Sequence, residues 1–354
     1  IRFSQVAGYL EKIINRNIEA GQTITGDMIE VKSPGKGLQP NRKKELVGCQ
    51  IKRSMKEGDF FYPSDLLKIQ VQSRPYNFNR SWGIPVRYHD FQILLNKTNP
   101  DLLEFHLSYK DLELNISKFF VNEYDQNFIV HCPELFEEDH ILDLCSVDVN
   151  YRQRSVQQMQ RVINVTRDLQ KYFPHTSCPL IVTNVGGFTT NSALPKSERN
   201  RLYEILLNSL SQLDSSGIEI IPQTMPPFPW HMGGQQFHNI FIESADVVEF
   251  CESENYRVCF DVSHSKLACN HSGYSFKRFT ESVAKVTAHL HLADAKGLDG
   301  EGLQIGDGEI DFFALAETLG KVAPSASFIP EVWQGHKNEG EGFWKSLENL
   351  EKWF

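Results

Sequence analysis

Polar side chains that can bind a metal or move a proton follow short apolar segments in the second half of the sequence. Asp261 and His264 form an Asp-x-x-His pair, His289 and His291 alternate along one segment, and Glu331 follows the last segment. Imidazole and carboxylate together suit Zn, Mn or Co better than Ca, with Mg as a further candidate. The pattern therefore predicts a divalent metal site.

Such a site can polarise a carbonyl group and stabilise the enediolate that forms when a neighbouring carbon loses its proton. Carboxylates on opposite sides of the substrate can then remove and return that proton. This is the chemistry of sugar isomerases and epimerases. The same ligands could instead activate water for phosphoester hydrolysis. Taken singly, each residue also has a structural interpretation; Asp261, for example, could cap a helix.

The elements that position these residues are eight short apolar strands alternating with amphipathic helices. The predicted strands are Ile84–Tyr88, Leu103–His106, Phe128–His131, Leu180–Asn184, Ile218–Ile221, Arg257–Asp261, Ala288–Leu292 and Ser327–Pro330. The predicted helices are Tyr151–Phe173, Lys196–Leu213, Glu243–Ser253, Phe312–Val322 and Trp344–Phe354. This alternation predicts an α/β fold, a (β/α)8 TIM barrel whose polar residues gather at the C-terminal ends of its strands. A doubly wound sheet is the structural alternative.

A polar linker at residues 73–82 separates the barrel, residues 83–354, from a smaller region at residues 1–72. The smaller region is rich in glycine turns and reads as a mostly β domain, with a hint of helix only at Gly8–Ile14. The charge changes at the same boundary, from +4 in residues 1–72 to −13 in the remainder of the 354 residues. An acidic barrel argues against a nucleic-acid partner.

Two further properties of the sequence concern its environment. No apolar run approaches the roughly 18–20 residues that cross a bilayer, so we expect no membrane partner. The seven cysteines are odd in number and scattered, without Cys-x-x-Cys spacing. Such cysteines are typical of reduced thiols, and we expect a cytoplasmic protein.

From about residue 83 to residue 354 the sequence resembles the xylose-isomerase-like barrel superfamily, which contains sugar-phosphate isomerases and epimerases and the apurinic endonucleases. The motifs that carry the resemblance are Cys259–His264, His289–Asp294 and Ile329–Glu331. The resemblance implies that Asp261, His291 and Glu331 are metal ligands. It also implies that Glu331 is an acid/base carboxylate and that His264 is a ligand or a substrate contact.

The sequence departs from this family at the end of the fifth strand. Members of the family usually have a glutamate there that is both metal ligand and base, whereas this chain has Gln223. An amide oxygen can bind a metal weakly, but an amide is no general base near neutral pH. The candidates for the missing base are Glu104, His131 and His231.

Two loops are expected to contact a small polar substrate. Residues 225–236 are rich in Pro, Trp and Gly and read as a lid or a wall of the site, while residues 297–308 could bring backbone N–H groups close to an anion. The candidate substrate contacts are Trp230, His231, Asp294, Lys296 and His336.

Residues 1–72 resemble the SAF domain, an antifreeze-like β-clip found at the C-terminus of sialic-acid synthases. The matching segments are Asn17–Ile24, Asp27–Ile29, Val31–Leu38, Leu46–Gly48 and Gly58–Asp59. In those synthases the module contributes an arginine to the sugar site; the stretch Gly8–Lys12 aligned with it contains none. A SAF module normally follows a synthase barrel, and this sequence starts at Ile1 without Met. We therefore expect the C-terminal part of a fusion whose missing part makes a nonulosonic acid.

The leading hypothesis is a metal-dependent isomerase or epimerase of a sugar or sugar phosphate, an amino sugar of sialic-acid-type biosynthesis. Its expected partner is a fused or neighbouring synthase domain, and a homo-oligomer is left open. One alternative is a non-catalytic, sugar-binding or scaffolding barrel, which Gln223 favours. The other is an endonuclease-like phosphodiesterase, against which the charge of the barrel counts.

Overall fold

The computed structural model describes residues 11–32, 38, 42–66, 72–228 and 236–354. By its internal contacts the chain divides into two compact units. One contains residues 1–73 and 336–344, and the other contains residues 74–335 and 345–354. Each unit has a hydrophobic core of its own.

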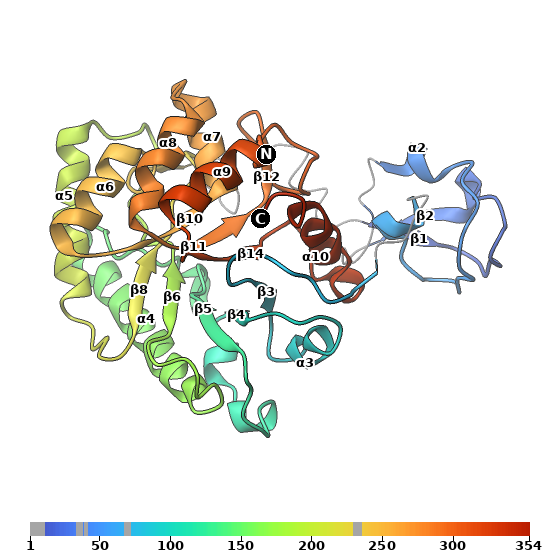
Figure 1. Cartoon of the computed structure of the whole chain (residues 1–354), viewed down its shortest axis with the longest axis horizontal. Coiled ribbons are helices and arrows are strands. Elements are labelled where there is room, and N and C mark those ends of the chain that lie inside the picture. Colours follow the sequence, from blue (N-terminus) through green and yellow to red (C-terminus); the bar gives the residue numbers. More distant parts are fainter. Residues whose placement is uncertain (1–10, 33–37, 39–41, 67–71, 229–235) are drawn as a thin grey trace. The chain divides into compact units, whose positions relative to one another are not determined.

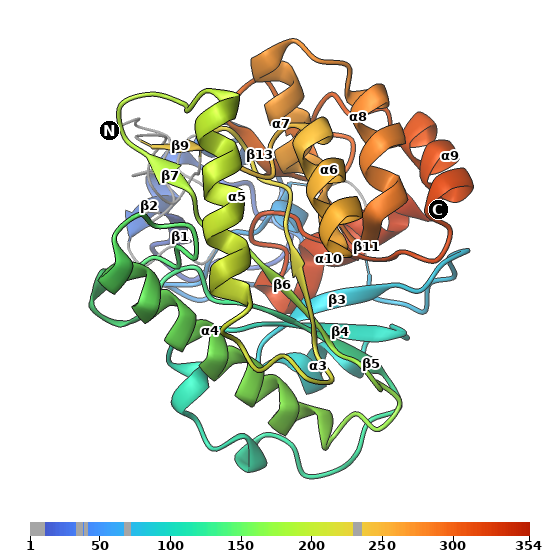
Figure 2. The same ribbon diagram turned by 90° about the vertical axis from the view of Figure 1, so that its left-hand side faces the viewer.

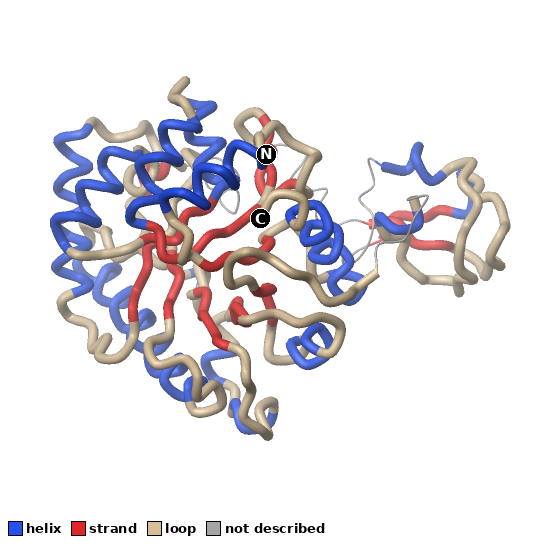
Figure 3. Tube along the Cα trace, viewed as in Figure 1, coloured by secondary structure: helices blue, strands red, loops and turns tan. Residues whose placement is uncertain are grey.

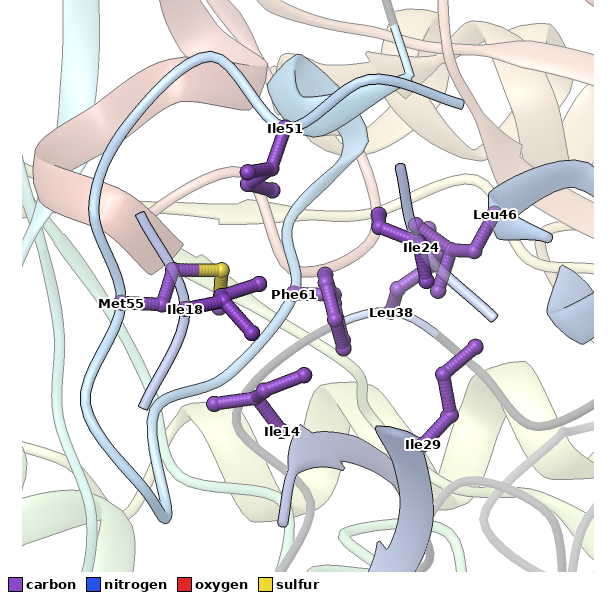
Figure 4. Packing of buried hydrophobic residues seen from close by; sticks show 9 residues of the cluster. All are labelled: Ile14, Ile18, Ile24, Ile29, Leu38, Leu46, Ile51, Met55 and Phe61. Carbon is purple, nitrogen blue, oxygen red and sulfur yellow. The ribbon is translucent and has the colours of Figure 1, made fainter. Parts of the chain in front are cut away.

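The first unit has little regular structure and is held by a compact apolar core. Strands β1 (Glu11–Ile14) and β2 (Ile29–Lys32) pair antiparallel, and single bridges join Ile18 to Met55 and Thr23 to Gln50. The helical pieces are short: η2 (Gly26–Met28), α2 (Lys43–Leu46) and η4 (Pro63–Asp65). The core, shown in Figure 4, consists of Ile14, Ile18, Ile24, Ile29, Leu38, Leu46, Ile51, Met55 and Phe61.

The hint of helix at Gly8–Ile14 was wrong for the described part of that segment. Glu11–Ile14 is a strand, and residues 8–10 lie outside the described residues. The reason is tertiary: the segment pairs with β2, Ile13 bridges to Phe60, and Ile14 enters the core. A seven-residue apolar pattern cannot tell a strand from a helix when such distant partners decide the outcome.

The second unit is built on eight parallel strands (Figure 1). They are β3 (Gly83–Val86), β4 (Leu102–His106), β5 (Asn127–His131), β6 (Leu180–Thr183), β8 (Glu219–Pro222), β10 (Val258–Asp261), β11 (Thr287–Leu292) and β14 (Ser327–Pro330). Each begins and ends within two residues of its predicted bounds. The predicted (β/α)8 barrel is therefore confirmed.

The barrel closes at two places, where its two sheets meet. The strands form a five-stranded sheet, β3-β4-β5-β6-β8, and a three-stranded sheet, β10-β11-β14. Single parallel bridges join the sheets, between Trp82 and Phe328 on one side and between Gln223 and Cys259 on the other. The second bridge matters for function because Gln223 is one of the predicted site residues.

Helices cover the outside of the strands, as Figures 2 and 3 show. They are α3 (Phe91–Leu95), α4 (Val149–Gln170), α5 (Lys196–Leu210), α6 (Ser244–Glu254), α7 (Val262–Ser272), α8 (Phe276–Val283) and α9 (Phe312–Val322). Helix α10 (Lys337–Leu350) begins among the residues assigned to the first unit and ends in the second. Short 3-10 helices are η5 (Asp111–Glu113), η6 (Ile116–Lys118), η7 (Glu137–Asp139) and η9 (Ala284–Val286). Two antiparallel strand pairs extend beyond the barrel strands: β7 (Phe188–Thr189) pairs with β9 (Phe237–His238), and β12 (Asp294–Lys296) forms a hairpin with β13 (Gly300–Leu303).

The first two connections lack full-length helices. Between β3 and β4 there is only the five-residue α3, and between β4 and β5 only 3-10 turns. Aromatic packing covers the strands there instead: Phe91 stacks on Phe120 with ring centroids 4.7 Å apart, and Phe105 lies 5.6 Å from Phe120. Buried aromatic rings thus supply the apolar surface that a longer helix would supply elsewhere in the barrel.

Candidate active site

The interior of the barrel consists of an apolar layer followed by a polar one. The apolar cluster contains Leu102, Ile129, Val182, Ile221, Cys259, Ala288 and Ile329. Two residues further along the chain from six of these, at the end of a strand or just after it, come Glu104, His131, Asn184, Gln223, Asp261 and Glu331. Side chains two apart on a strand share a face, so these polar groups form the next layer toward the C-terminal ends.

The four predicted metal ligands come together around His291. Its Nδ1 lies 2.6 Å from Oε2 of Glu331 and 3.8 Å from Oδ2 of Asp261. Nε2 of Gln223 lies 3.1 Å from the same Nδ1 and donates a hydrogen bond of 3.0 Å to Oδ2 of Asp261. Three side chains at the ends of β8, β10 and β14 thus lie near Nδ1 of His291, which comes from β11.

On the other side of His291 lies Glu104, a completely buried carboxylate among three imidazoles. Its oxygens are 2.8 Å from Nε2 of His106, 2.9 Å from Nε2 of His289 and 3.0 Å from Nε2 of His291. Oε1 of Glu104 and Nε2 of both His106 and His289 have close neighbours but no well-directed hydrogen bond. Burial alone would raise the pKa of Glu104, but His291, His106 and His289 hold it well below its usual range.

This arrangement orients His291 for metal binding. An ionised carboxylate only accepts hydrogen bonds, so the Glu104 contact favours a proton on Nε2 of His291. Burial opposes a charge on His291, but Cys259, Glu104 and Glu331 raise its pKa well above its usual range, so without a metal Nδ1 also holds a proton, which it donates to Oε2 of Glu331. A bound cation would displace that proton and take the lone pair of Nδ1, which faces Glu331, Gln223 and Asp261. A carboxylate that holds the far nitrogen of a ligating histidine is a common second partner at metal sites. Burial lowers the pKa of His106 and of His289, which keeps both rings neutral.

The donor set fits a divalent cation. One nitrogen of His291, one of His131 and an oxygen of Glu331 lie within 4.8 Å of one another, and so do single donor atoms of Glu104, His289 and His291. We favour the first group because it lies beside Asp261 and Gln223 and because Glu331 is 28% exposed. Turning the Gln223 amide over would present its oxygen to the same position, although an amide brings no charge.

His264 lies next to this cluster, at the start of α7. Its backbone N–H donates to Oδ1 of Asp261, which caps the helix. Its Nδ1 is 3.0 Å from the carbonyl oxygen of Thr224 and therefore donates a proton to it. Its Nε2 lies 3.2 Å from Oε1 of Glu301, a residue of β13 that the sequence interpretation missed. Burial opposes the charge on His264, but Asp261 and Glu301 raise its pKa to about 10.

The structure gives two of the predicted residues different roles. Glu104, predicted as a base, is inaccessible and held by three histidines, so it positions His291 rather than touching substrate. Asp294, predicted as a substrate contact, is 1% exposed. Its carboxylate accepts the backbone N–H groups of Gly306, Gly308 and Ile310, which folds residues 294–310 back over the barrel end. The reason in both cases is burial, which an isolated motif does not reveal.

Among the other predicted residues, His131 belongs to the group around His291. His131 is half-buried, and its ring stacks on that of His106 with centroids 4.6 Å apart. Burial and His106 lower the pKa of His131. Lys296 is exposed on the β12–β13 hairpin. His336 belongs to the other compact unit, and Trp230 and His231 lie outside the described residues.

Asn184 marks a second polar group near the barrel end. Its Nδ2 lies 3.4 Å from Nε2 of His238 and 3.5 Å from Oε1 of Glu134. His238 comes from β9 and was not a candidate from the sequence, because its position depends on the pairing of β9 with β7, some fifty residues earlier in the chain. Outside this group lies a cavity of about 600 Å³, lined among others by Asp143, Tyr151 and Phe188. None of the predicted site residues lines it.

Comparison with known families gives two matches along the chain. The family described as xylose isomerase-like TIM barrel matches residues 91–353, and the SAF domain family matches residues 13–67. A curated relative, the uncharacterised protein MJ1311 of Methanocaldococcus jannaschii, is 26% identical over 209 residues. That region is 57% of this chain and 62% of the relative, so the match spans less than two thirds of its length.

Solved structures of sugar epimerases share the barrel. A D-tagatose 3-epimerase-like protein is 19% identical with a TM-score of 0.51, and the match covers 77% of this chain and 98% of that one. A D-allulose 3-epimerase from Methylomonas sp. is 12% identical with a TM-score of 0.55 and coverages of 80% and 100%. An L-ribulose 3-epimerase is 16% identical with a TM-score of 0.51 and coverages of 76% and 94%. At these identities the likeness concerns the fold. Among the described residues no helix is long and apolar enough to cross a membrane.

Proposed function

The chain belongs to the xylose isomerase-like TIM barrel family, and on this premise we propose that it is a metal-dependent isomerase or epimerase of a sugar or sugar phosphate. The observation that carries the proposal is the convergence of Asp261, His291 and Glu331 from three neighbouring strands, with Nδ1 of His291 facing both carboxylates. A bound divalent cation would polarise the substrate carbonyl and stabilise the enediolate.

The side chains of the protein would transfer the proton and hold the ligating histidine in place. Glu331 is the accessible carboxylate of the cluster, with one oxygen against His291 and the other 3.9 Å from Nδ1 of His106. It can take the proton from the carbon next to the carbonyl group, while the electron pair of that bond forms the double bond of the enediolate. Glu104 keeps the His291 ring in place throughout, because it holds the opposite nitrogen.

We further propose that the substrate is an amino sugar or its phosphate. The support is the SAF match at residues 13–67, because the resemblance of this module is to the C-terminal domain of sialic-acid synthases. A synthase domain, fused or neighbouring, would then be the partner, the cytoplasm the compartment, and Zn, Mn, Co or Mg the metal. The SAF module supports the choice of substrate and partner, and the donor types support the choice of metals.

Deuterium exchange tests the activity. We expect the protein, loaded with each metal in turn, to incorporate deuterium from D2O next to the carbonyl of at least one N-acetylated hexosamine or hexosamine phosphate, measured by NMR. An apo sample prepared with chelator is the control. If metal binds but none of these sugars exchanges, the non-catalytic barrel that Gln223 favours becomes the better interpretation.

Replacing Gln223 with Glu should tighten divalent metal binding about tenfold or more, which is about 1.4 kcal/mol. The added carboxylate would face Nδ1 of His291 from 3.1 Å, where the amide now contributes no charge. Isothermal titration with Mn²⁺ measures the change, and Gln212→Glu, at an exposed position, adds the same charge elsewhere. Equal affinity in the two variants would show that Gln223 does not face the metal.

A further inference from the structure

Glu301 occupies a fixed position at the end of the barrel although it lies in a hairpin. Its neighbour Gly302 donates its N–H to Oγ of Ser263 and accepts the N–H of Trp333, at 2.9 Å and 2.7 Å. Gly302 has a φ of +64°, and an added Cβ would come within 3.5 Å of the Trp333 backbone. Asp294, the first residue of β12, accepts the N–H of Gly306, which follows β13, and so ties the two ends of the hairpin together. The side chain of Glu301 is thereby held between the ends of β10 and β14.

His264, which contacts Glu301, has only one ring nitrogen left to share a proton with it. Nδ1 of His264 already donates to the carbonyl oxygen of Thr224, so the contact between Nε2 and Oε1 of Glu301 contains a single shared proton. The side chain of Glu301 is 18% exposed, and its Oε2 has no hydrogen-bond partner among the described residues. One carboxylate oxygen is therefore available to a substrate.

The Glu301–His264 pair lies near Gln223, the position at which the expected proton-transfer group is missing. Thr224, which orients His264, directly follows Gln223, and Gln223 cannot act as a base. Inversion at a carbon needs two proton-transfer groups, because the proton leaves from one face and returns to the other. Glu331 supplies one such group, while Glu104 is sealed inside the barrel.

We propose that Glu301, sharing a proton with His264, is the second proton-transfer group of the site, and that the reaction is therefore an epimerisation. This inference rests on the proposed function. Glu331 removes the proton from one epimer, and the electron pair of the broken bond enters the enediolate. The Glu301–His264 pair then gives its shared proton to the opposite face of that carbon, the enediolate pair forms the new C–H bond, and water restores the protonation of both groups.

The test distinguishes proton transfer at one face of the carbon from proton transfer at the other. In Glu301→Gln we expect interconversion of the two epimers to fall at least about a hundredfold, the usual contribution of a positioned acid or base. The epimer whose proton Glu331 removes should still exchange with D2O, whereas the other epimer should not. Metal affinity should stay within about twofold. Glu301→Asp, which keeps the carboxyl group, should recover part of the interconversion.

Glu309→Gln is the matched control, because it lies beyond the same hairpin and its amide oxygen can still accept the N–H of Gly297. If Glu301→Gln interconverts the epimers at a rate within about threefold of that control, the role of Glu301 is refuted while the proposed function stands. If the wild-type protein binds metal but exchanges no sugar, both proposals fall together. Equal loss of exchange from both epimers in Glu301→Gln would also overturn the assignment, because a structural role would produce it.

Discussion

Glu331→Gln is expected to reduce sugar proton exchange about a thousandfold, within the range for loss of a positioned base. The same change should weaken metal binding, because the carboxylate oxygen that lies 2.6 Å from Nδ1 of His291 becomes part of a neutral amide. Deuterium incorporation from D2O and a metal titration of the same preparation measure the two effects. Together they distinguish this residue from Glu301, whose replacement should leave metal affinity unchanged.

The matched control is Glu348→Gln, the same chemical change at an exposed position of α10. It should leave both exchange and affinity unchanged. A Glu331→Gln protein that binds metal normally and exchanges at more than about a tenth of the wild-type rate would remove Glu331 from both roles. The metal-ligand role proposed for Glu331 would then pass to His131, the third member of the group that contains His291 and Glu331.

Glu104→Gln should lower the free energy of unfolding by about 3 kcal/mol, because breaking a buried charge network leaves its partners uncompensated. The amide has the shape of the carboxylate but directs donors at some of the three imidazole nitrogens that now surround it at 2.8 to 3.0 Å. Urea denaturation monitored by circular dichroism measures the loss. Metal affinity should also fall about tenfold to a hundredfold, since His291 loses the group that orients it.

For comparison, Glu113→Gln removes a carboxylate that is 59% exposed and pairs with Arg161 on the surface. Such pairs contribute less than about 1 kcal/mol, so this variant should be nearly neutral. If Glu104→Gln is as stable as Glu113→Gln, the buried cluster does not depend on an ionised carboxylate. The tautomer assigned to His291 would then be wrong as well.

The barrel could be predicted because its strands are short, apolar and fully buried, and because each ends at a polar residue. The same period of two that predicts a strand also places Asp261 two residues after Cys259 and Glu331 two residues after Ile329, both of which lie in the apolar cluster. The proposed metal ligands could therefore be predicted from the sequence as a group. The first two connections were the weakest part of that prediction, and there aromatic packing replaces full-length helices.

The sequence could not reveal how deeply each carboxylate is buried or where the loops run. Glu104 and Glu331 are both strand carboxylates, yet one is inaccessible and the other is 28% exposed, and only the closed barrel distinguishes them. Glu301 lies between two glycines in a turn-rich stretch, so its contact with His264 depends on a hairpin register that local patterns do not determine. The one available signal was a carboxylate, one of three in residues 297–308, in the loop that follows the seventh strand.

The alternation of layers inside the barrel also bears on how such a site can change over evolutionary time. Deleting or inserting one residue within β8, β10 or β14 would turn Gln223, Asp261 or Glu331 from the interior to the outside, so these strands tolerate replacements but not changes of length. Glu301 is under no such constraint, because it is delivered by a hairpin between strands. A lineage could therefore gain or lose this group by altering one loop, while the ligands contributed by the strands are inherited as a set.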